Sequence, residues 1–431
     1  MKIVKNNNSF TDNTNEIDSE TIFVQNLLNT KYIEQAKQQN PKAIIDCKEL
    51  SEYFDFSNIK IVGITGTNGK TTTAAAIYSM LLDLGYKVAL LGTRGFFVNE
   101  EKVKDYSFTT PMQIELFGDI EYALSQGCEF FITEVSSHAI AQNRICGINF
   151  ELKIHTNITG DHLDYHNTLE EYIAVKNSFF KDDGKKLINK DDKHIKINIK
   201  NGFSYGLDSP STYKVQAFSF KDGTSIVLQK FDEMVTFHSD LRGTFNVYNL
   251  TAAVAAIDIL TDKSLEEIGE VSDNFAGVSG RMETISYDPY VIIDFAHTHE
   301  AMESVMESFK DKDIIVVFGA GGDRDKIKRP LMGAVASNHA KHIFITSDNP
   351  RFEDPDMINE DVLKGIKDKS NVEVELNRTK AIYDAIEKAK ENKNSVVLIL
   401  GKGDEEYQII YDKKIPLNDK QIVTKYFEQV S

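Results

Sequence analysis

The chain has 431 residues, 41% of them hydrophobic, which is enough for two or three domains that each bury a core. Its formal net charge of −17 opposes non-specific binding to nucleic acid, so anionic ligands must be held by local groups and not by the overall field. Three cysteines, Cys47, Cys128 and Cys146, exclude a disulfide framework and show no metal-binding spacing, which is typical of a reducing compartment.

The N-terminal region is predicted to be a small α/β unit that ends near Asn58. Its first ten to fifteen residues are polar and expected to be loose, and they lack the apolar stretch of a secretory signal. The apolar runs Ile22–Val24 and Ala43–Ile45 are expected to form short strands. No apolar run in the chain approaches the ~20 residues of a membrane-spanning helix, so we expect a cytoplasmic protein without a membrane partner.

A larger alternating unit is predicted to follow. It begins with the apolar run Ile59–Ile64, a glycine-rich turn and a helix Lys70–Leu84, which Gly85 ends in the manner of a left-handed cap. Helices alternate with further buried strands, the pattern of a parallel sheet covered on both faces. These strands are expected at Val88–Leu91, Phe130–Val135 and Leu152–Ile158.

Between about Phe203 and Leu241 the pattern changes to short strands of period two, with a hairpin turn at Asp222-Gly223. A helix is expected at Asn246–Leu260. After Arg281 a second alternating unit is typical of a doubly wound, Rossmann-like domain. Its strands are expected at Val291–Phe295, Ile314–Phe318, His342–Thr346, Val372–Leu376 and Val396–Leu400.

The fold class predicted from these elements is α/β, with three domains. Residues 1–58 form the small N-terminal domain. Residues 59–281 form a P-loop ATPase-like parallel sheet with an added β-meander. Residues 282–431 form the doubly wound domain.

The segment from Thr65 to Thr72, which reads TGTNGKTT, lies between a predicted strand and a predicted helix. Backbone N–H groups of such a turn, together with the helix N-terminus, can surround phosphate oxygens. Lys70 can then offset the charge of the β- and γ-phosphates, and Thr71 can ligate Mg²⁺. The longer P-loop pattern requires glycine where Ile64 stands, so the loop is a shortened variant; the alternative is an ordinary strand–helix turn.

Two features point to metal or phosphate binding beyond the loop. Glu134 ends an apolar strand and is our candidate for completing the Mg²⁺ site, although a lone glutamate is commonly just a solvated strand end. His155, His162 and His166 cluster after another strand, and their density indicates a second metal or phosphate site. Isolated histidines are more often ordinary surface or core residues.

Lys176 lies on the apolar face of a predicted helix, four residues after Tyr172 and three before Phe179. A lysine in such a position usually extends to solvent. Alternatively, burial lowers its pKa, and the neutral amine takes up CO₂ as a carbamate that can hold a second Mg²⁺. Periodicity alone favours the first alternative.

Together these motifs resemble the Mur ligase superfamily from Ile59 onward. Phe245–Asn249 is similar to its motif near the adenine and ribose, Gly280–Glu283 to its hinge, and Asp294–Thr298 to its strand-end motif at the nucleotide. The resemblance implies that Lys70, Lys176 and His162 are catalytic, that Lys176 is carbamylated, and that Thr71, Glu134, His162 and this carbamate hold Mg²⁺. It implies ATP contacts at Gly66, Thr67, Asn68, Gly69, Lys70, Thr71, Thr72, Asn246, Asn249, Arg281, Asp294 and His297.

Within the superfamily, the sequence most resembles the branch that adds the third residue of the peptidoglycan stem peptide. Asp348-Asn349-Pro350-Arg351 matches the form of the acceptor motif associated with meso-diaminopimelate, although on its own it would be a strand-to-loop turn. The resemblance implies contacts to UDP-N-acetylmuramoyl-L-alanyl-D-glutamate at Ser19, Thr109, Thr110, Ser136, Gln142 and Arg144. It implies acceptor contacts at Arg324, Asp348, Asn349, Pro350, Arg351, Gly401 and Glu405.

The implied activity is an ATP- and Mg²⁺-dependent amide ligase that activates the γ-carboxyl of D-glutamate as an acyl phosphate. Alternatives are a lysine-adding, dipeptide-adding or folylpolyglutamate-type ligase, a P-loop kinase or ATP-driven switch, and a non-catalytic UDP-sugar-binding relative. Gly160 and Asp404 depart from the usual arginine and histidine of the family pattern. We expect a monomer whose last domain closes on its small-molecule substrates.

Overall fold

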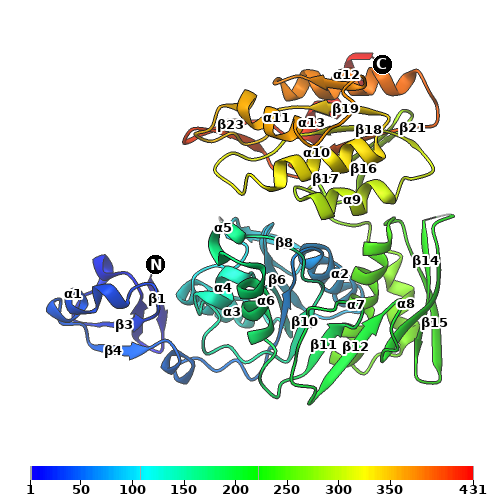
Figure 1. Cartoon of the computed structure of the whole chain (residues 1–431). Coiled ribbons are helices and arrows are strands. Elements are labelled where there is room, and N and C mark those ends of the chain that lie inside the picture. The colour runs from blue at the N-terminus through cyan, green and yellow to red at the C-terminus, as the bar shows by residue number, and fades with distance from the viewer. Residues whose placement is uncertain (1, 107, 222, 431) are drawn as a thin grey trace.

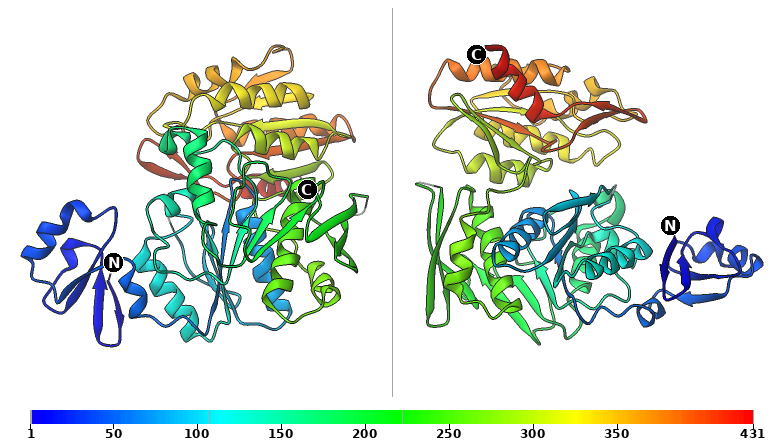
Figure 2. Two further views of the ribbon diagram at one scale, coloured as in Figure 1. Left: turned by 60° about the horizontal axis from the view of Figure 1, so that its bottom comes forward. Right: turned by 180° about the vertical axis from the view of Figure 1, so that it is seen from behind.

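The computed structural model describes residues 2–106, 108–221 and 223–430 and arranges the chain in three lobes (Figure 1). In Figure 1 the N-terminal lobe lies to the left of the central lobe and the C-terminal lobe lies above it; the right view of Figure 2 shows the same three lobes from behind. Each lobe is built on its own main sheet, which confirms the predicted α/β class. Among the described residues, no helix is both long and apolar enough to cross a lipid bilayer.

The N-terminal lobe contains a four-stranded sheet of order β1-β2-β3-β4. The expectation of a loose N-terminus is wrong, because β1 and β2 pair as an antiparallel hairpin. Its turn residues Asn6 and Asn7 have φ values of 50° and 61°, the left-handed region that tight hairpins need and asparagine tolerates. Phe10 is fully buried and fixes the hairpin to the core. The elements are β1 (Lys2–Lys5), β2 (Asn8–Thr11), β3 (Thr21–Gln25), α1 (Ile33–Gln38) and β4 (Ala43–Asp46), of which β3 and β4 were predicted.

The central lobe contains an eleven-stranded sheet of order β15-β14-β13-β12-β11-β10-β5-β9-β6-β7-β8. The strands from β13 to β6 run parallel, and the antiparallel strands β14 and β15 at one edge and β7 and β8 at the other extend the sheet. This confirms the parallel sheet with an added meander. Asp222 of the predicted hairpin turn lies outside the described residues, and the strands on either side of it pair antiparallel. The strands are β5 (Lys60–Thr65), β6 (Val88–Gly92), β7 (Gly95–Val98), β8 (Glu101–Lys104), β9 (Phe130–Glu134), β10 (Leu152–His155), β11 (Lys186–Asn189), β12 (Gly202–Gly206), β13 (Tyr213–Ser219), β14 (Thr224–Lys230) and β15 (Glu233–Ser239).

Strand β10 stops three residues before its predicted end. The following residues turn toward the glycine-rich loop instead, where the carbonyl of Asn157 accepts a hydrogen bond of 2.7 Å from the backbone N–H of Thr67. The loop between β5 and α2 is therefore braced by the chain that leaves β10. The helices of this lobe are α2 (Lys70–Asp83), α3 (Gln113–Ser125), α4 (Ser137–Ala141), α5 (Leu163–His166), α6 (Leu169–Ser178), α7 (Thr244–Leu260) and α8 (Leu265–Ser272).

The C-terminal lobe contains a six-stranded sheet of order β16-β17-β21-β18-β19-β20, parallel except for β16. Apolar residues fill both of its faces, which confirms the doubly wound arrangement. A separate hairpin, β22 and β23, was not predicted. The elements are β16 (Glu283–Tyr287), β17 (Tyr290–Asp294), α9 (His299–Glu307), β18 (Asp313–Phe318), α10 (Lys328–His339), β19 (His342–Ile345), α11 (Pro355–Leu363), β20 (Val372–Val374), α12 (Arg378–Lys390), β21 (Ser395–Leu400), β22 (Tyr407–Ile410), β23 (Lys413–Pro416) and α13 (Asp419–Val430).

Candidate active site

The glycine-rich loop connects β5 directly to α2. Gly69 has φ 84°, and a Cβ atom added there would lie 2.3 Å from Asn249 Oδ1, so this position requires glycine. The amine of Lys70, the first residue of α2, donates hydrogen bonds of 2.9 Å to the carbonyls of Gly66 and Thr67. The lysine is therefore folded over the loop that the sequence predicts to bind phosphate.

Glu134 lies at the end of β9, beside the start of α2, and is almost fully buried. Its Oε2 atom accepts a hydrogen bond of 3.0 Å from Thr71 Oγ1, and its Oε1 atom accepts one of 2.8 Å from the backbone N–H of Thr93. The hydroxyl of Thr71 and the carboxylate of Glu134 are oxygen ligands on adjacent elements, and Mg²⁺ prefers oxygen ligands. The residues therefore fit a divalent cation between Thr71 and Glu134.

Thr93 was not singled out from the sequence. It follows β6, the neighbour of β9 in the parallel sheet, so the shared carboxyl edge of these strands was the available signal. A cavity of about 220 Å³ opens beside Thr71 and Glu134, with apolar walls that include Tyr78, Phe97 and Phe275. Ligand-sized space therefore adjoins the predicted cation site.

Lys176 on α6 is almost fully buried, so the alternative in which it extends to solvent is wrong. Its amine donates a hydrogen bond of 2.8 Å to the carbonyl of Gly66, which Lys70 also contacts, and lies 4.8 Å from the centre of the Tyr172 ring. Burial, and then the charge of Lys70, hold the pKa of Lys176 well below its usual range. A neutral amine beside the glycine-rich loop is the form that carbamate formation requires.

The three clustered histidines do not converge on one point. His155 Nε2 lies 3.4 Å from a carboxylate oxygen of Asp192, and His166 Nε2 lies 3.0 Å from Ser137 Oγ. His162, in a left-handed conformation, lies beside Asp161; burial lowers its pKa to about 4, so the imidazole is neutral near pH 7. Over the ranges that the structure describes, no three His, Cys, Asp or Glu side chains are grouped to hold a metal ion.

Asp161 adjoins the clustered histidines, but no role was predicted for it from the sequence. Its Oδ1 atom lies 2.6 Å from the amine of Lys328 on α10, so this ion pair crosses from the central to the C-terminal lobe. Burial opposes ionisation of Asp161, but the neighbouring side chains of His162, His297 and Lys328 hold its pKa well below the usual value. A carboxylate at this position therefore stays charged.

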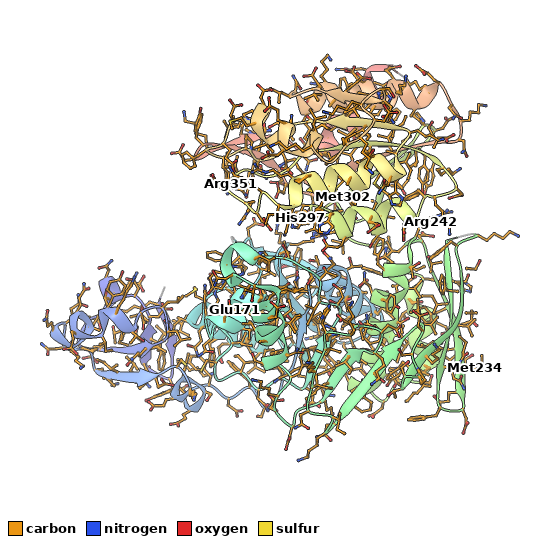
Figure 3. All side chains as sticks on the ribbon, viewed as in Figure 1. Glu171, Met234, Arg242, His297, Met302 and Arg351 are labelled. Carbon is orange, nitrogen blue, oxygen red and sulfur yellow. The ribbon has the colours of Figure 1, made fainter. Side chains whose placement is uncertain are left out.

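The predicted nucleotide residues beyond the loop lie on α7 and around the hinge. Asn249 Nδ2 donates a hydrogen bond of 3.1 Å to Asn246 Oδ1, and both amides are buried next to the start of α2. The guanidinium of Arg281 stacks 4.1 Å from the centre of the Phe295 ring. Figure 3 places His297 on the side of the C-terminal lobe that faces the central lobe.

Asp294 ties the hinge to the end of β17. Its carboxylate accepts hydrogen bonds of 2.8 Å from the backbone N–H of Met282 and 2.7 Å from that of Ala296. Burial raises the pKa of this carboxyl, and the charge of Arg281 opposes that rise. The hinge and the strand end thus form one unit.

Five of the six predicted UDP-substrate residues form a single network next to Glu134. Thr110 Oγ1 donates to the carbonyl of Glu134 at 2.9 Å and accepts from the backbone N–H of Ser136 at 3.0 Å. Arg144 donates to the carbonyl of Thr110 at 2.7 Å and to Gln142 Oε1 at 2.7 and 2.9 Å. Thr109 joins the network through a contact of 3.1 Å with Thr93, whereas Ser19 lies apart from it, in an exposed turn before β3.

The predicted acceptor residues converge from the loops after β18, β19 and β21, the carboxyl ends of parallel strands. Arg351, labelled in Figure 3, has φ 52° and donates a hydrogen bond of 2.7 Å to the carbonyl of Gly322. Burial, and then the neighbouring charge of Arg324, lower the pKa of Arg351. A Cβ atom at Gly322 would lie 1.8 Å from the Pro350 carbonyl oxygen, so the two loops touch.

The other half of this region carries carboxylates. Asn349 Nδ2 donates a hydrogen bond of 2.9 Å to Glu405 Oε2, and the preceding residue, Asp348, is buried. Burial raises the pKa of Asp348, and the charge of Lys402 opposes that rise. Gly401, at φ 109°, passes close to Asp348: an added Cβ atom would lie 3.0 Å from Asp348 Oδ2. Arginine on one side and carboxylates on the other can bind a ligand that carries both charges.

Comparison with known proteins finds similarity to Mur ligases along almost the whole chain. The family described as "Mur ligase middle domain" matches residues 64–257, and that described as "Mur ligase, glutamate ligase domain" matches residues 280–403. The UDP-N-acetylmuramoyl-L-alanyl-D-glutamate--2,6-diaminopimelate ligase of Helicobacter pylori (strain J99) is 50% identical over 427 residues, with 96% of this chain and 95% of that protein covered. The ligase of the same name from Wolinella succinogenes is 48% identical over 412 residues, with coverages of 96% and 94%.

Solved structures agree with these relatives. A ligase of the same name superposes with a TM-score of 0.70 at 28% identity and covers 98% of this chain and 94% of its own. The folylpolyglutamate synthase of Mycobacterium tuberculosis complexed with ADP and AMPPCP, with a TM-score of 0.65 at 15% identity and coverages of 80% and 89%, shares the fold. The chain therefore belongs to the Mur ligase family and is an ATP-dependent ligase.

Proposed function

We propose that this chain joins meso-diaminopimelate to the γ-carboxyl of D-glutamate in UDP-N-acetylmuramoyl-L-alanyl-D-glutamate, with release of ADP and phosphate. The relatives at 50% and 48% identity carry the name of that activity. The observation that carries the proposal is the acceptor region, where the charges of two carboxylates, Asp348 and Glu405, act on the guanidinium of Arg351. Diaminopimelate has a second amino-acid centre with both a carboxylate and an ammonium, and lysine lacks that carboxylate.

The chemistry requires two negative reactants to meet. A carboxylate does not react with an amine at neutral pH, because oxide is a poor leaving group, so ATP first converts it into an acyl phosphate. Lys70, folded over the glycine-rich loop, offsets the charge of the phosphates. The network of Thr110, Ser136 and Arg144 next to Glu134 orients the UDP-linked substrate toward the same point.

We further propose two Mg²⁺ positions, which supply the positive charge that brings the phosphate and carboxylate together. Thr71 and Glu134 fit the first, because their oxygen atoms lie within 3.0 Å of each other. Glu134, His162 and Lys176 as its carbamate would hold the second. The lowered pKa of His162 supports a neutral imidazole, and that of Lys176 supports the neutral amine from which the carbamate forms. The acceptor amine then attacks, and phosphate leaves from a tetrahedral intermediate.

Phosphate release from ATP tests the activity. Purified chain is supplied with the UDP-linked dipeptide and one of meso-diaminopimelate, L-lysine or glutamate. We expect release only when the dipeptide and diaminopimelate are both present, and none from the Lys70→Ala variant. Release that follows L-lysine or glutamate instead would assign another acceptor, and release without the dipeptide would favour a kinase or a switch protein.

Further features of the chain are proposed with this function. Domain limits at residues 1–58, 59–281 and 282–431 are supported by the changes of sheet after β4 and before β16. Ser19 is proposed to contact the uridine nucleotide from the N-terminal lobe. A cytoplasmic location is proposed, because the nucleotide and amino-acid substrates occur in the cytoplasm. The chain is also proposed to be a monomer. Light scattering of the purified chain tests the monomer.

A further inference from the structure

We infer that Lys402 is a positioning residue that fixes Asn349 and Glu405 and sets the charge balance by which the acceptor pocket prefers a ligand with a carboxylate at its far end. The inference rests on the proposed function, because it concerns the choice among acceptors. Lys402 lies between Gly401 and Gly403 in the loop after β21. Nothing in the sequence motifs distinguished it from an exposed lysine.

The amine of Lys402 is fully enclosed, and its side chain has no exposed surface. It donates hydrogen bonds of 2.6 Å to Glu405 Oε2, 2.8 Å to the carbonyl of Tyr407 and 3.3 Å to Asn349 Oδ1. An ammonium group has three donors, and all three are used. Lys402 therefore cannot bind the acceptor itself and must act through the groups that it holds.

Those groups form a closed set. Asn349 Nδ2 donates to the same oxygen of Glu405 at 2.9 Å, and Asn349 Oδ1 also accepts from the backbone N–H of Ile409 at 2.8 Å. The carboxamide of Asn349 and one oxygen of Glu405 are thus fixed in position by Lys402 and by the first strand of the β22–β23 hairpin. A buried ion pair with this many hydrogen bonds orients its members more than it stabilises the fold.

Two carboxylate oxygens are left to meet a ligand. Asp348 Oδ1 is buried without a hydrogen-bond partner and lies 3.7 Å from Lys402 Nζ, and Asp348 itself is 6% exposed. Glu405 Oε1 makes no hydrogen bond with any residue that the structure describes. A buried polar atom without a partner is costly unless a ligand or water satisfies it. Both oxygens suit the ammonium of an acceptor whose carboxylate binds Arg351.

The charge of Lys402 decides how negative this pocket is. With Lys402 in place, the negative charges of Asp348 and Glu405 are opposed by the cations of Lys402, Arg351 and the neighbouring Arg324. The buried Arg378–Asp419 pair behind them, 2.7 Å apart, balances itself. Without Lys402 the pocket becomes more negative by one charge. It then favours an acceptor that ends in a lone ammonium, such as L-lysine, over one that also carries a carboxylate.

Steady-state kinetics of the full-length Lys402→Met variant tests the inference. We expect the KM for meso-diaminopimelate to rise by about tenfold or more, while the KM values for MgATP and the UDP-linked dipeptide change by less than about twofold. The ratio of kcat/KM for diaminopimelate to that for L-lysine should fall by about tenfold. Lys402→Arg keeps the positive charge but not the compact amine, so its ratio should lie between those of Lys402→Met and the wild-type chain.

Lys367→Met, an exposed lysine of the same lobe, is the matched control and should leave all three KM values unchanged. The double variant Lys402→Met/Glu405→Gln provides a second test if Lys402→Met alone does not fold, because it removes the uncompensated carboxylate together with the lysine. If Lys402 acts through Glu405, Lys402→Met should lower the acceptor ratio less in the Glu405→Gln background than in the wild-type chain.

Equal rises in all three KM values, or an unchanged acceptor ratio, would overturn the inference and leave the proposed function intact. Fully additive effects in the double variant would overturn the route through Glu405. A wild-type chain that uses no diaminopimelate at all would instead overturn the proposed function, and the inference with it.

Discussion

The amine of Lys328 lies 2.6 Å from the carboxylate of Asp161, and this ion pair joins α10 of the C-terminal lobe to the loop next to His162 in the central lobe. The side chains are only 16% and 11% exposed, so solvent screens the pair little. A second pair crosses the same boundary, with Arg94 Nε 3.3 Å from Asp404 Oδ2, but its side chains are 36% and 34% exposed. We therefore expect closure of the C-terminal lobe to depend mainly on the pair of Lys328 and Asp161.

We expect the Lys328→Met variant to lower kcat by about tenfold, because the lobe that supplies the acceptor closes less often over the phosphate site. Small-angle scattering should show a larger radius of gyration for this variant. Asp404→Asn, which removes the more exposed pair, is the comparison and should have a smaller effect on both quantities. Identical scattering and kinetics for Lys328→Met and wild type would show that the pair does not control closure.

We expect Glu134→Gln to raise the Mg²⁺ concentration needed for half-maximal ATP turnover and to lower kcat by about a hundredfold. The amide removes the negative charge and turns a donor toward the donors of Thr71 and Thr93, which both contact the wild-type carboxylate. Thr93→Ser keeps the backbone and hydroxyl donors and serves as the control. An unchanged Mg²⁺ titration in Glu134→Gln would remove Glu134 from the cation site.

Strands with a continuous apolar run in the sequence could be predicted, because that pattern lies within the strand itself. Strands β5, β9, β18 and β21 are continuous apolar runs that are buried on both faces, and their positions match the expectation within one or two residues. The β1–β2 hairpin was missed because it has four-residue strands and its turn signal is Asn6-Asn7 within a polar run. The early end of β10 was missed because its cause is a contact with a distant loop.

The candidate site likewise contains residues that a local sequence pattern predicts and residues that only long-range contacts bring together. The glycine-rich loop and Glu134 could be predicted because a strand end or a helix start fixes their positions. Lys402, Asp161 and Lys328 could not, because their roles come from contacts between segments far apart in the chain. Helical periodicity placed Lys176 on the apolar face, but only the packed structure shows that its amine is buried and does not reach solvent.

We expect the activity to depend on dissolved CO₂, and more strongly at lower pH. The pKa of Lys176 is lowered by burial and by Lys70, so the neutral amine that reacts with CO₂ exists above that lowered pKa and is lost as the pH falls through it. Removing CO₂ should therefore reduce turnover most in the acidic half of the pH range, and added bicarbonate should restore it.

Labelled bicarbonate followed by ¹³C NMR provides a direct readout of the carbamate. The Lys176→Met variant should lack the signal and show low turnover that bicarbonate does not change. Wild-type turnover that is independent of CO₂ at every pH would refute the carbamate.

Replacing Arg351 should impair use of diaminopimelate far more than binding of ATP. A guanidinium grips a carboxylate with two parallel hydrogen bonds, and a site built around such a pair rejects a ligand that leaves it unpaired. We expect Arg351→Ala to raise the KM for diaminopimelate by about a hundredfold and to change that for MgATP by less than about twofold.

The backbone at Arg351 offers a control for strain. Its φ of 52° is disfavoured for alanine but not for glycine, so Arg351→Gly should melt at a higher temperature than Arg351→Ala while losing the same acceptor affinity. Equal loss of affinity in two variants of unequal stability would assign the effect to the missing guanidinium. If the loss of affinity followed the melting temperature instead, or if MgATP binding weakened as much as acceptor binding, Arg351 would be a structural residue of the loop.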